Sequence, residues 1–243
     1  MTPRFYCPLP LEPNTVIELA PAPAHHALRV LRLGTGAAIT LFNGEGGEFS
    51  ATLEHNGSRK VHARIGAPRA VERESPLAVT LAQGLASVER MDYAIQKAVE
   101  LGVAAIVPVA TARSVTRLDA ERAEKRRAHW QQIAIGACEQ CGRNRVPEVQ
   151  LPYGIDAWLR QPSTATLRLL LLPDAEESLT AFESPRGAVD LLVGPEGGLS
   201  ADETTAAMHA GFRAVRLGPR TLRTETAGLV ALTAMNALWG DLR

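Results

Sequence analysis

Two largely apolar runs, residues 167–172 and 189–193, most constrain how this 243-residue chain can fold. Each is about the length of one strand, and apolar residues nearly fill it instead of alternating with polar ones. Such runs are typical of parallel strands that helices cover on both faces. Further strand-like and helix-like segments alternate in the chain: residues 77–81, 87–101, 104–109 and 119–141. The alternation predicts a doubly wound α/β domain whose ligands bind outside the carboxyl ends of the strands.

The first part of the chain has a different pattern of apolar and polar residues. Short alternating runs at residues 37–42, 48–53 and 60–65 are separated by Gly-rich turns, one of them Asn56-Gly57, which favours hairpins. A helical pattern over residues 23–33 precedes them, so we expect a small barrel with one helix. The charged, Pro-containing residues 67–76 are typical of a linker. We therefore predict two domains, residues 1–70 and 71–243.

Composition limits the class of protein more than it identifies a partner. Basic and acidic residues are both 26 in number, so net charge indicates no partner, whereas residues 213–223 hold four Arg and no acid and favour a local anionic ligand. Three cysteines without a disulfide-like framework, and no signal peptide, predict a reducing cytoplasm. The apolar runs are too short to span a membrane.

Two strand-to-helix joints concentrate the residues that can perform chemistry. One is Gly194-Pro195-Glu196-Gly197-Gly198, after a buried strand and before the capping-box pattern of Ser200 and Glu203. The other, residues 217–227, packs Gly, Pro, Arg, Thr and Glu in front of an apolar helical tail. An ordinary tight loop and a helix-dipole role for the Glu are the simple alternatives. Neither joint is a GxGxxG or P-loop sequence, so a ligand other than a dinucleotide or nucleoside triphosphate is expected.

These joints resemble the two cofactor motifs of the SPOUT methyltransferases. Within that superfamily the chain is most similar to the RsmE family, the bacterial small-subunit (16S) rRNA uridine N3-methyltransferases. The resemblance extends over nearly the whole chain, in order: residues 3–6, 26–32, 97–103, 113–114 and 139–143. No single segment of this series is specific, but the order and the spacing are.

The resemblance implies a fold and a cofactor beyond what the spacing shows. It implies a C-terminal trefoil knot formed by the loops after Leu172, Val193 and Leu217, and a PUA-like N-terminal barrel that binds RNA. It implies S-adenosylmethionine as cofactor and a homodimer. No metal is expected, because the sequence offers no complete set of metal ligands. The implied cofactor-binding residues are Leu172, Pro173, Gly194, Pro195, Glu196, Gly198, Leu217, Gly218, Leu222, Thr224 and Ala227.

Methylation of uracil N3 needs loss of a proton, after which negative charge spreads over O2 and O4. Arg223 is the candidate that stabilises this charge, and Glu225 or Glu196 could take the proton. Alternatively, no dedicated base is needed and positioning of the methyl donor determines the rate. Basic residues in the matched segments are the candidates for RNA contacts, with solvent-exposed surface charge as the alternative: Arg4, Arg29, Arg32, Lys97, Arg113 and Arg143.

Two alternative interpretations stay open. The chain could be a non-catalytic RNA-binding assembly factor on a degenerate SPOUT scaffold, although both joints are intact. It could instead be a SPOUT enzyme that acts on tRNA or on another rRNA base. Cys138 with Cys141, or His25 with His26, could suggest a metal, but two ligands do not complete a zinc site and adjacent helical residues do not share a face.

Overall fold

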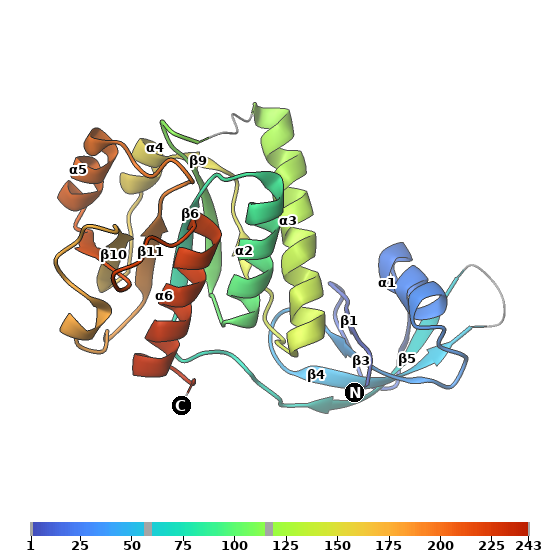
Figure 1. The fold of residues 1–243 in the computed structure, drawn as a ribbon. Coiled ribbons are helices and arrows are strands. Elements are labelled where there is room, and N and C mark those ends of the chain that lie inside the picture. The colour runs from blue at the N-terminus through green and yellow to red at the C-terminus, as the bar shows by residue number, and fades with distance from the viewer. Residues whose placement is uncertain (1, 56–59, 115–118, 243) are drawn as a thin grey trace. The chain divides into compact units, whose positions relative to one another are not determined.

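The computed structural model describes residues 2–55, 60–114 and 119–242, which form two compact units (Figure 1). Unit 1 comprises Met1–Glu74 and Cys138–Val146, and unit 2 comprises Ser75–Ala137 and Pro147–Arg243. The segment Cys138–Val146 therefore belongs to unit 1, although it lies far beyond the expected boundary at residue 70. The Asn56-Gly57 turn lies outside the described residues.

Unit 1 is built on a curled five-stranded sheet, in the order β1-β3-β4-β5-β2. Its strands are β1 (Arg4–Tyr6), β2 (Val16–Glu18), β3 (Ala38–Phe42), β4 (Glu48–Glu54) and β5 (His62–Arg69). β1 is parallel to β3, and the other neighbours are antiparallel. Among the described residues no pairing joins β1 to β2, so the expected barrel is an open half-barrel.

A short helical segment closes one side of the core of unit 1. It consists of α1 (Pro21–His25) and a π-helical turn, η1 (His26–Val30), so the predicted helix is present but is not regular. Ala24 and Ala27 of this segment are buried in one cluster with Phe5, Leu41 and Ile65 of the sheet.

The expected linker at residues 67–76 is partly wrong, because β5 continues to Arg69 and pairs with β4 after a bulge. β2 pairs with β5 only between His62 and Arg64. Pro68 therefore lies where β5 pairs with β4 alone, the kind of edge position at which sheets tolerate a proline.

Unit 2 contains the predicted parallel sheet. Its main strand order is β12-β10-β11-β6-β7-β8, and β9 also pairs with β7. The strands are β6 (Val79–Gly84), β7 (Ala105–Ala110), β8 (Glu148–Val149), β9 (Tyr153–Gly154), β10 (Leu167–Leu171), β11 (Val189–Val193) and β12 (Arg213–Val215). All the pairings are parallel, so the α/β class predicted from the apolar runs is confirmed.

Helices cover both faces of this sheet (Figure 1). α2 (Val88–Glu100) and α6 (Thr224–Trp239) pack side by side on one face. α3 (Ala120–Cys141) runs beside α2, with His129 within 2.9 Å of Asp92. α4 (Ile155–Leu159) packs with α5 (Ala201–His209), where Trp158 and Phe212 bury their rings. A 3₁₀ turn, η2 (Leu179–Ala181), lies between β10 and β11.

The two helices that flank the predicted joints begin in different ways. α5 begins with the predicted capping box, in which Ser200 and Glu203 satisfy each other's backbone N–H groups. α6 begins at Thr224, three residues before the expected start at Ala227, because Arg223 has an extended backbone and its carbonyl accepts the N–H groups of Thr226 and Ala227. The polar residues of that joint therefore form the first turn of a helix.

Candidate functional site

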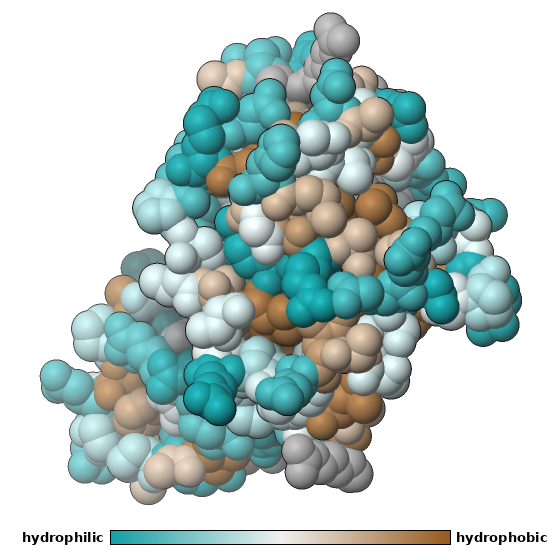
Figure 2. All heavy atoms as spheres, turned by 90° about the vertical axis from the view of Figure 1, so that its left-hand side faces the viewer, coloured by the Kyte–Doolittle hydropathy of each residue, from teal (hydrophilic) through white to brown (hydrophobic). Residues whose placement is uncertain are grey.

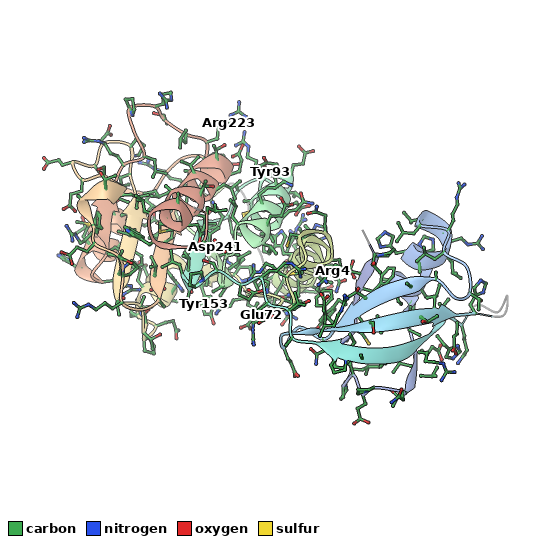
Figure 3. All side chains as sticks on the ribbon, turned by 90° about the horizontal axis from the view of Figure 1, so that it is seen from below. Arg4, Glu72, Tyr93, Tyr153, Arg223 and Asp241 are labelled. Carbon is green, nitrogen blue, oxygen red and sulfur yellow. The ribbon has the colours of Figure 1, made fainter. Side chains whose placement is uncertain are left out.

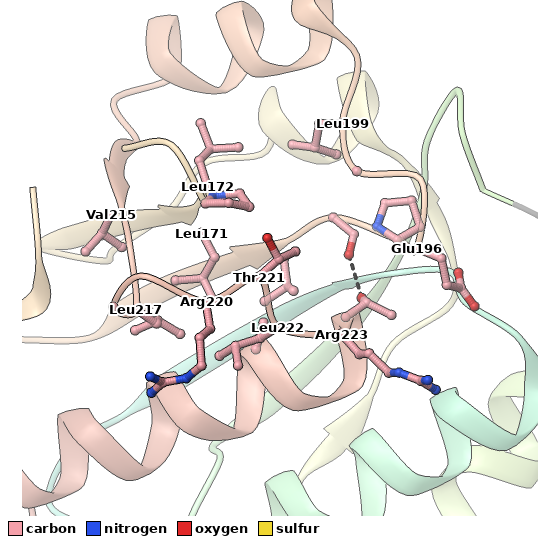
Figure 4. A pocket seen from close by; sticks show the side chains of 18 of the residues that line it. Leu171, Leu172, Glu196, Leu199, Val215, Leu217, Arg220, Thr221, Leu222 and Arg223 are labelled. Atoms are coloured by element: carbon pink, nitrogen blue, oxygen red, sulfur yellow. Dashed lines mark hydrogen bonds between the residues drawn. The ribbon is translucent and has the colours of Figure 1, made fainter. Parts of the chain in front are cut away.

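A cavity of about 380 Å³ opens at the carboxyl ends of β10, β11 and β12. The loops that follow these three strands form its walls, and apolar side chains such as Leu172, Leu199 and Leu222 line much of it (Figure 4). In the space-filling view from the side of α5 and β10, apolar side chains remain exposed among hydrophilic ones (Figure 2). The cavity therefore lies where α/β sheets bind ligands, and its size and lining suit a small organic molecule.

Glycines allow the loop after β11 to fold tightly against the end of β6. Gly198 has a φ of +70°, a conformation that side chains disfavour. A Cβ on Gly194 would lie 3.2 Å from the backbone of Gly198 and Leu199. A Cβ on Gly84, the last residue of β6, would lie 2.7 Å from the carbonyl carbon of Gly194. The loop thus approaches the strand end more closely than a side chain would permit.

A chain of hydrogen bonds ties this loop to the start of α6. The Thr224 hydroxyl donates to the Gly194 carbonyl at 2.5 Å, as the dashed line in Figure 4 marks. The Gln83 side-chain amide donates in turn to the Thr224 hydroxyl at 2.8 Å. Both side chains are buried, so these bonds are shielded from water and fix the two joints relative to each other.

Charged groups gather at the end of the cavity beside α2. Glu196 and Arg223 lie at this end, and Arg220 points to the opposite end (Figure 4). Arg90 of α2 also lines the cavity and lies between two carboxylates, those of Glu196 and Glu225. The Arg223 side chain is exposed, and no hydrogen bond or ion pair to it is found among the described residues. Its guanidinium is thus available to a ligand.

The two candidate bases have different surroundings. Burial raises the pKa of Glu196, but hydrogen bonds from the Ser87 N–H, from its own N–H and from Arg90 outweigh burial and leave this pKa below its ordinary value. Glu225 does not line the cavity, and its Oε2 atom is buried without a hydrogen-bond partner among the described residues. Glu196 is therefore a weak proton acceptor, because its charged form is already stabilised.

The structure brings together the residues that the sequence predicts for the cofactor. Every one of them lines the cavity: Leu172, Pro173, Gly194, Pro195, Glu196, Gly198, Leu217, Gly218, Leu222, Thr224 and Ala227. Arg223 lies there too. The structure therefore shows that these residues share one cavity, and their individual roles in cofactor binding stay predictions.

Sequence analysis missed two polar residues of this site, Arg90 and Gln83. Arg90 lies on α2, more than a hundred residues before its acidic partners, and no motif marks it. Gln83 could have been predicted, because a polar residue at the buried end of an apolar strand must find hydrogen bonds.

The six predicted RNA-contacting residues fall into distinct environments. The Arg4 side chain is 7% exposed and pairs with Glu48 and Asn144, and buried Arg143 pairs with Glu74. Arg29 and Arg32 are exposed on unit 1.

Two of the six lie on unit 2. Lys97 pairs with Glu100 on α2. Arg113 donates to the carbonyl of Gly197 at 3.0 Å and thereby supports the Gly-rich loop. RNA contact stays a prediction for all six residues, of which Arg29, Arg32 and Arg113 are exposed.

The segment around residue 140 makes structural contacts within unit 1. Glu139 accepts the backbone N–H of Tyr6 at 2.9 Å, and the Cys138 thiol lies 3.6 Å from the carbonyl of Arg145. Burial raises the pKa of Cys138 to about 12, so its thiolate is scarce at neutral pH. Within the described residues, no group of three or more His, Cys, Asp or Glu side chains is placed to hold a metal ion.

None of the helices in the described parts of the chain is both long and apolar enough to cross a membrane.

Comparison with known proteins assigns the chain to a family. A family model described as an RNA methyltransferase domain matches residues 73–236, and one described as an RNA methyltransferase PUA domain matches residues 23–66. The ribosomal RNA small subunit methyltransferase E of Buchnera aphidicola (subspecies Schizaphis graminum) is 33% identical over 99% of this chain and 98% of its own length. The chain belongs to the ribosomal RNA small subunit methyltransferase E family. The Bacillus subtilis member is 34% identical over 87% of this chain and 86% of its own length.

Solved structures of similar chains extend the family comparison to the cofactor. The family member from Neisseria gonorrhoeae, bound to S-adenosylmethionine, is 42% identical with a TM-score of 0.93, and each chain is covered completely. A Legionella pneumophila methyltransferase in complex with the same cofactor is 41% identical with a TM-score of 0.96, again over all of both chains. The resemblance of the two joints to the RsmE family is therefore confirmed.

Proposed function

We propose that this chain is an S-adenosylmethionine-dependent methyltransferase that methylates N3 of a specific uridine in 16S rRNA of the small ribosomal subunit. One observation carries the proposal. The three loops at the carboxyl ends of β10, β11 and β12 converge on one cavity, in a family whose members are named for rRNA methylation. The arginine at the end of this cavity, Arg223, has no side-chain partner in the described part of the chain. The N3 position comes from the resemblance of the joints to the RsmE family.

The cavity suits the cofactor. Its volume of about 380 Å³ falls within the range of small-ligand sites, and its leucine-rich walls can cover an adenosine. The backbone around Leu217, Gly218 and Leu222 would bind the polar groups of the cofactor. Gly218 has a φ of +82° and no side chain, so its backbone is accessible to a ligand. S-adenosylmethionine supplies the electrophilic methyl group on its sulfonium.

Arg223 would stabilise the charge that develops on the uracil oxygens when N3 loses its proton. Neither carboxylate is well placed as a proton acceptor: the pKa of Glu196 is held down by Ser87 and Arg90, and Glu225 is largely buried outside the cavity lining. We therefore propose that no dedicated base acts and that water takes the N3 proton. Orientation of N3 against the methyl group supplies the rest of the rate.

RNA binding is assigned to residues 1–70 as a PUA-like domain and methyl transfer to residues 71–243. Arg29 and Arg32 on unit 1 and Lys97 and Arg113 on unit 2 would contact phosphates. Arg4 and Arg143 would act by holding the segment Cys138–Val146 in unit 1. A base inside folded rRNA must leave its stack before it reaches the cavity.

The remaining features of the proposal come from the resemblance. The loops after Leu172, Val193 and Leu217 would form a trefoil knot, and the protein would act in the cytoplasm. A homodimer is supported by exposed apolar side chains on the paired helices α2 and α6: Val88, Tyr93, Val230 and Leu238. Tyr93 projects from the same side of unit 2 as Arg223 (Figure 3), so a second copy that covers it would lie near the site.

Binding of S-adenosylhomocysteine, the product of transfer, should stabilise the protein against heat. A ligand that binds only the folded state adds about 2.7 kcal/mol at a hundredfold excess over Kd. For a chain of this size we expect Tm to rise by about 5 to 10 °C. Differential scanning fluorimetry measures the shift, with adenosine at the same concentration as control. An unchanged Tm at saturating ligand would contradict the proposed cofactor site.

The substrate can be tested in cells. N3 methylation blocks Watson–Crick pairing and stops reverse transcriptase, so a strain that lacks this protein should lose one stop in its 16S rRNA. Expression of the wild-type chain should restore the stop, and expression of Arg223→Ala should not. A stop pattern that does not change would show that the substrate is a different RNA or base.

A further inference from the structure

Arg90 connects three elements that are far apart in the sequence. It lies near the start of α2, and its Nη1 atom is 2.9 Å from Oε1 of Glu196 in the loop after β11. Its Nε atom is 3.6 Å from Oε1 of Glu225 in the first turn of α6. One guanidinium therefore faces both of the joints that form the cavity, and Arg90 itself lines the cavity.

Glu225 depends on Arg90 for its charge balance. The Glu225 side chain is 13% exposed, and Arg90 is the one cation within 4.0 Å of it among the described residues. Its second oxygen is buried and has no hydrogen-bond partner there. A buried carboxylate that loses its counter-charge is strongly destabilised, so removal of Arg90 would disturb the first turn of α6.

Glu196 transmits the same contact to the start of α2. Its Oε1 atom also accepts the backbone N–H of Ser87, the N-cap residue of α2, at 3.0 Å. The loop after β11 is therefore fastened to α2 through both a backbone N–H and the Arg90 side chain. These two donors also account in part for the lowered pKa of Glu196.

The contact requires the shape of an arginine. Two different nitrogens of Arg90 face the two carboxylates, which a planar, branched guanidinium permits. A lysine carries a single nitrogen and would pair well with only one carboxylate at a time. The residue type is thus matched to the two partners.

We propose that Arg90 is a positioning residue for methyl transfer, which holds the loop after β11 and the first turn of α6 at a fixed separation. Arg223 is the N-cap residue of that same turn, so the placement of its guanidinium depends on Arg90. The inference rests on the proposed function, and it assigns a role to a residue outside both cofactor motifs.

The test compares Arg90→Met, Arg90→Lys, Glu225→Gln and the double variant Arg90→Met/Glu225→Gln in the full-length protein. The readouts are kcat and KM with small ribosomal subunits from the deletion strain, and the Kd for S-adenosylhomocysteine by calorimetry. We expect Arg90→Met to lower kcat by about 10²-fold, because misplacement by about 1 Å costs that much. Arg90→Lys should fall between Arg90→Met and the wild type. The KM for RNA should change much less than kcat.

The double variant separates positioning from independent action. If Arg90 acts through Glu225, kcat of the double variant should be no lower than that of the slower single variant. Losses that multiply, or a wild-type kcat and KM in Arg90→Met, would overturn the inference. The matched control is Arg127→Met on α3, whose pair with Glu124 is similarly exposed (38% against 34% for the two arginine side chains) and lies outside the cavity lining. It should retain wild-type kinetics.

An unfolded Arg90→Met variant and an inactive wild-type protein are tested in different ways. If Arg90→Met does not fold, Arg90→Lys keeps the charge and provides the kinetic test, where an unchanged kcat overturns the inference. If the wild-type protein transfers no methyl group, the proposed function fails. The Kd for S-adenosylhomocysteine then decides on Arg90, since an affinity unchanged in Arg90→Met would contradict a positioning role.

Discussion

Arg223→Ala should lower the kcat of methyl transfer by about 10²- to 10³-fold, the usual cost of removing one donor that stabilises developing charge. The fold should be retained, because the side chain is exposed and makes no capping hydrogen bond at the start of α6. Single-turnover methylation of small ribosomal subunits with labelled S-adenosylmethionine measures the loss. The Kd for S-adenosylhomocysteine should change little, since the cavity walls stay in place.

Arg160→Ala is a suitable control for this result. Arg160 is an exposed arginine at the C-terminal end of α4 in unit 2, and it does not line the cavity. Its replacement removes the same charge from the same unit and should leave kcat unchanged. Normal turnover by Arg223→Ala would remove Arg223 from the mechanism, and equal losses in both variants would indicate a general charge effect.

Gly84→Ala should weaken cofactor binding strongly. The added methyl group would lie 2.7 Å from the Gly194 carbonyl carbon and closer still to the Pro195 nitrogen. Both are backbone atoms, so the loop itself must move, and the Thr224–Gly194 hydrogen bond would be strained. We expect a loss of stability of about 1 to 3 kcal/mol, as for other overpacked sites. We also expect the Kd for S-adenosylhomocysteine to rise, because the displaced Gly194–Pro195 backbone forms part of the cavity wall.

Gly136→Ala provides the matched control. Gly136 is exposed in the middle of α3, and a Cβ there meets no atom within 4 Å. The same chemical change should stabilise the protein by about 0.5 to 1 kcal/mol and leave the Kd unchanged. Urea unfolding and calorimetry measure both quantities. Wild-type affinity and stability in Gly84→Ala would show that the loop does not need this close approach.

Local patterns predicted much of the fold because they report local physics. The apolar runs at residues 167–172 and 189–193 became β10 and β11, since strands buried on both faces need apolar residues throughout. Ser200 and Glu203 form the capping box because its hydrogen bonds join residues three apart.

Weakly periodic segments were not predicted. β8, β9 and α4 have between two and five residues each, too few for a period to be visible. The π-helical turn at His26–Val30 likewise has no sequence pattern of its own. These elements are set by packing and by neighbouring strands, so their residues alone do not indicate them.

The two joints, with Arg223 between cavity wall and helix start, could be identified from the sequence because each joint is a contiguous string of residues. Tertiary structure alone decided that Glu225 faces Arg90, and that Gly84 lies against the Gly194–Pro195 backbone. These contacts join residues more than a hundred positions apart. The reason is physical: side-chain types determine which local structures form and which groups can react, whereas pairing between distant charges depends on where the sheet places the strand ends.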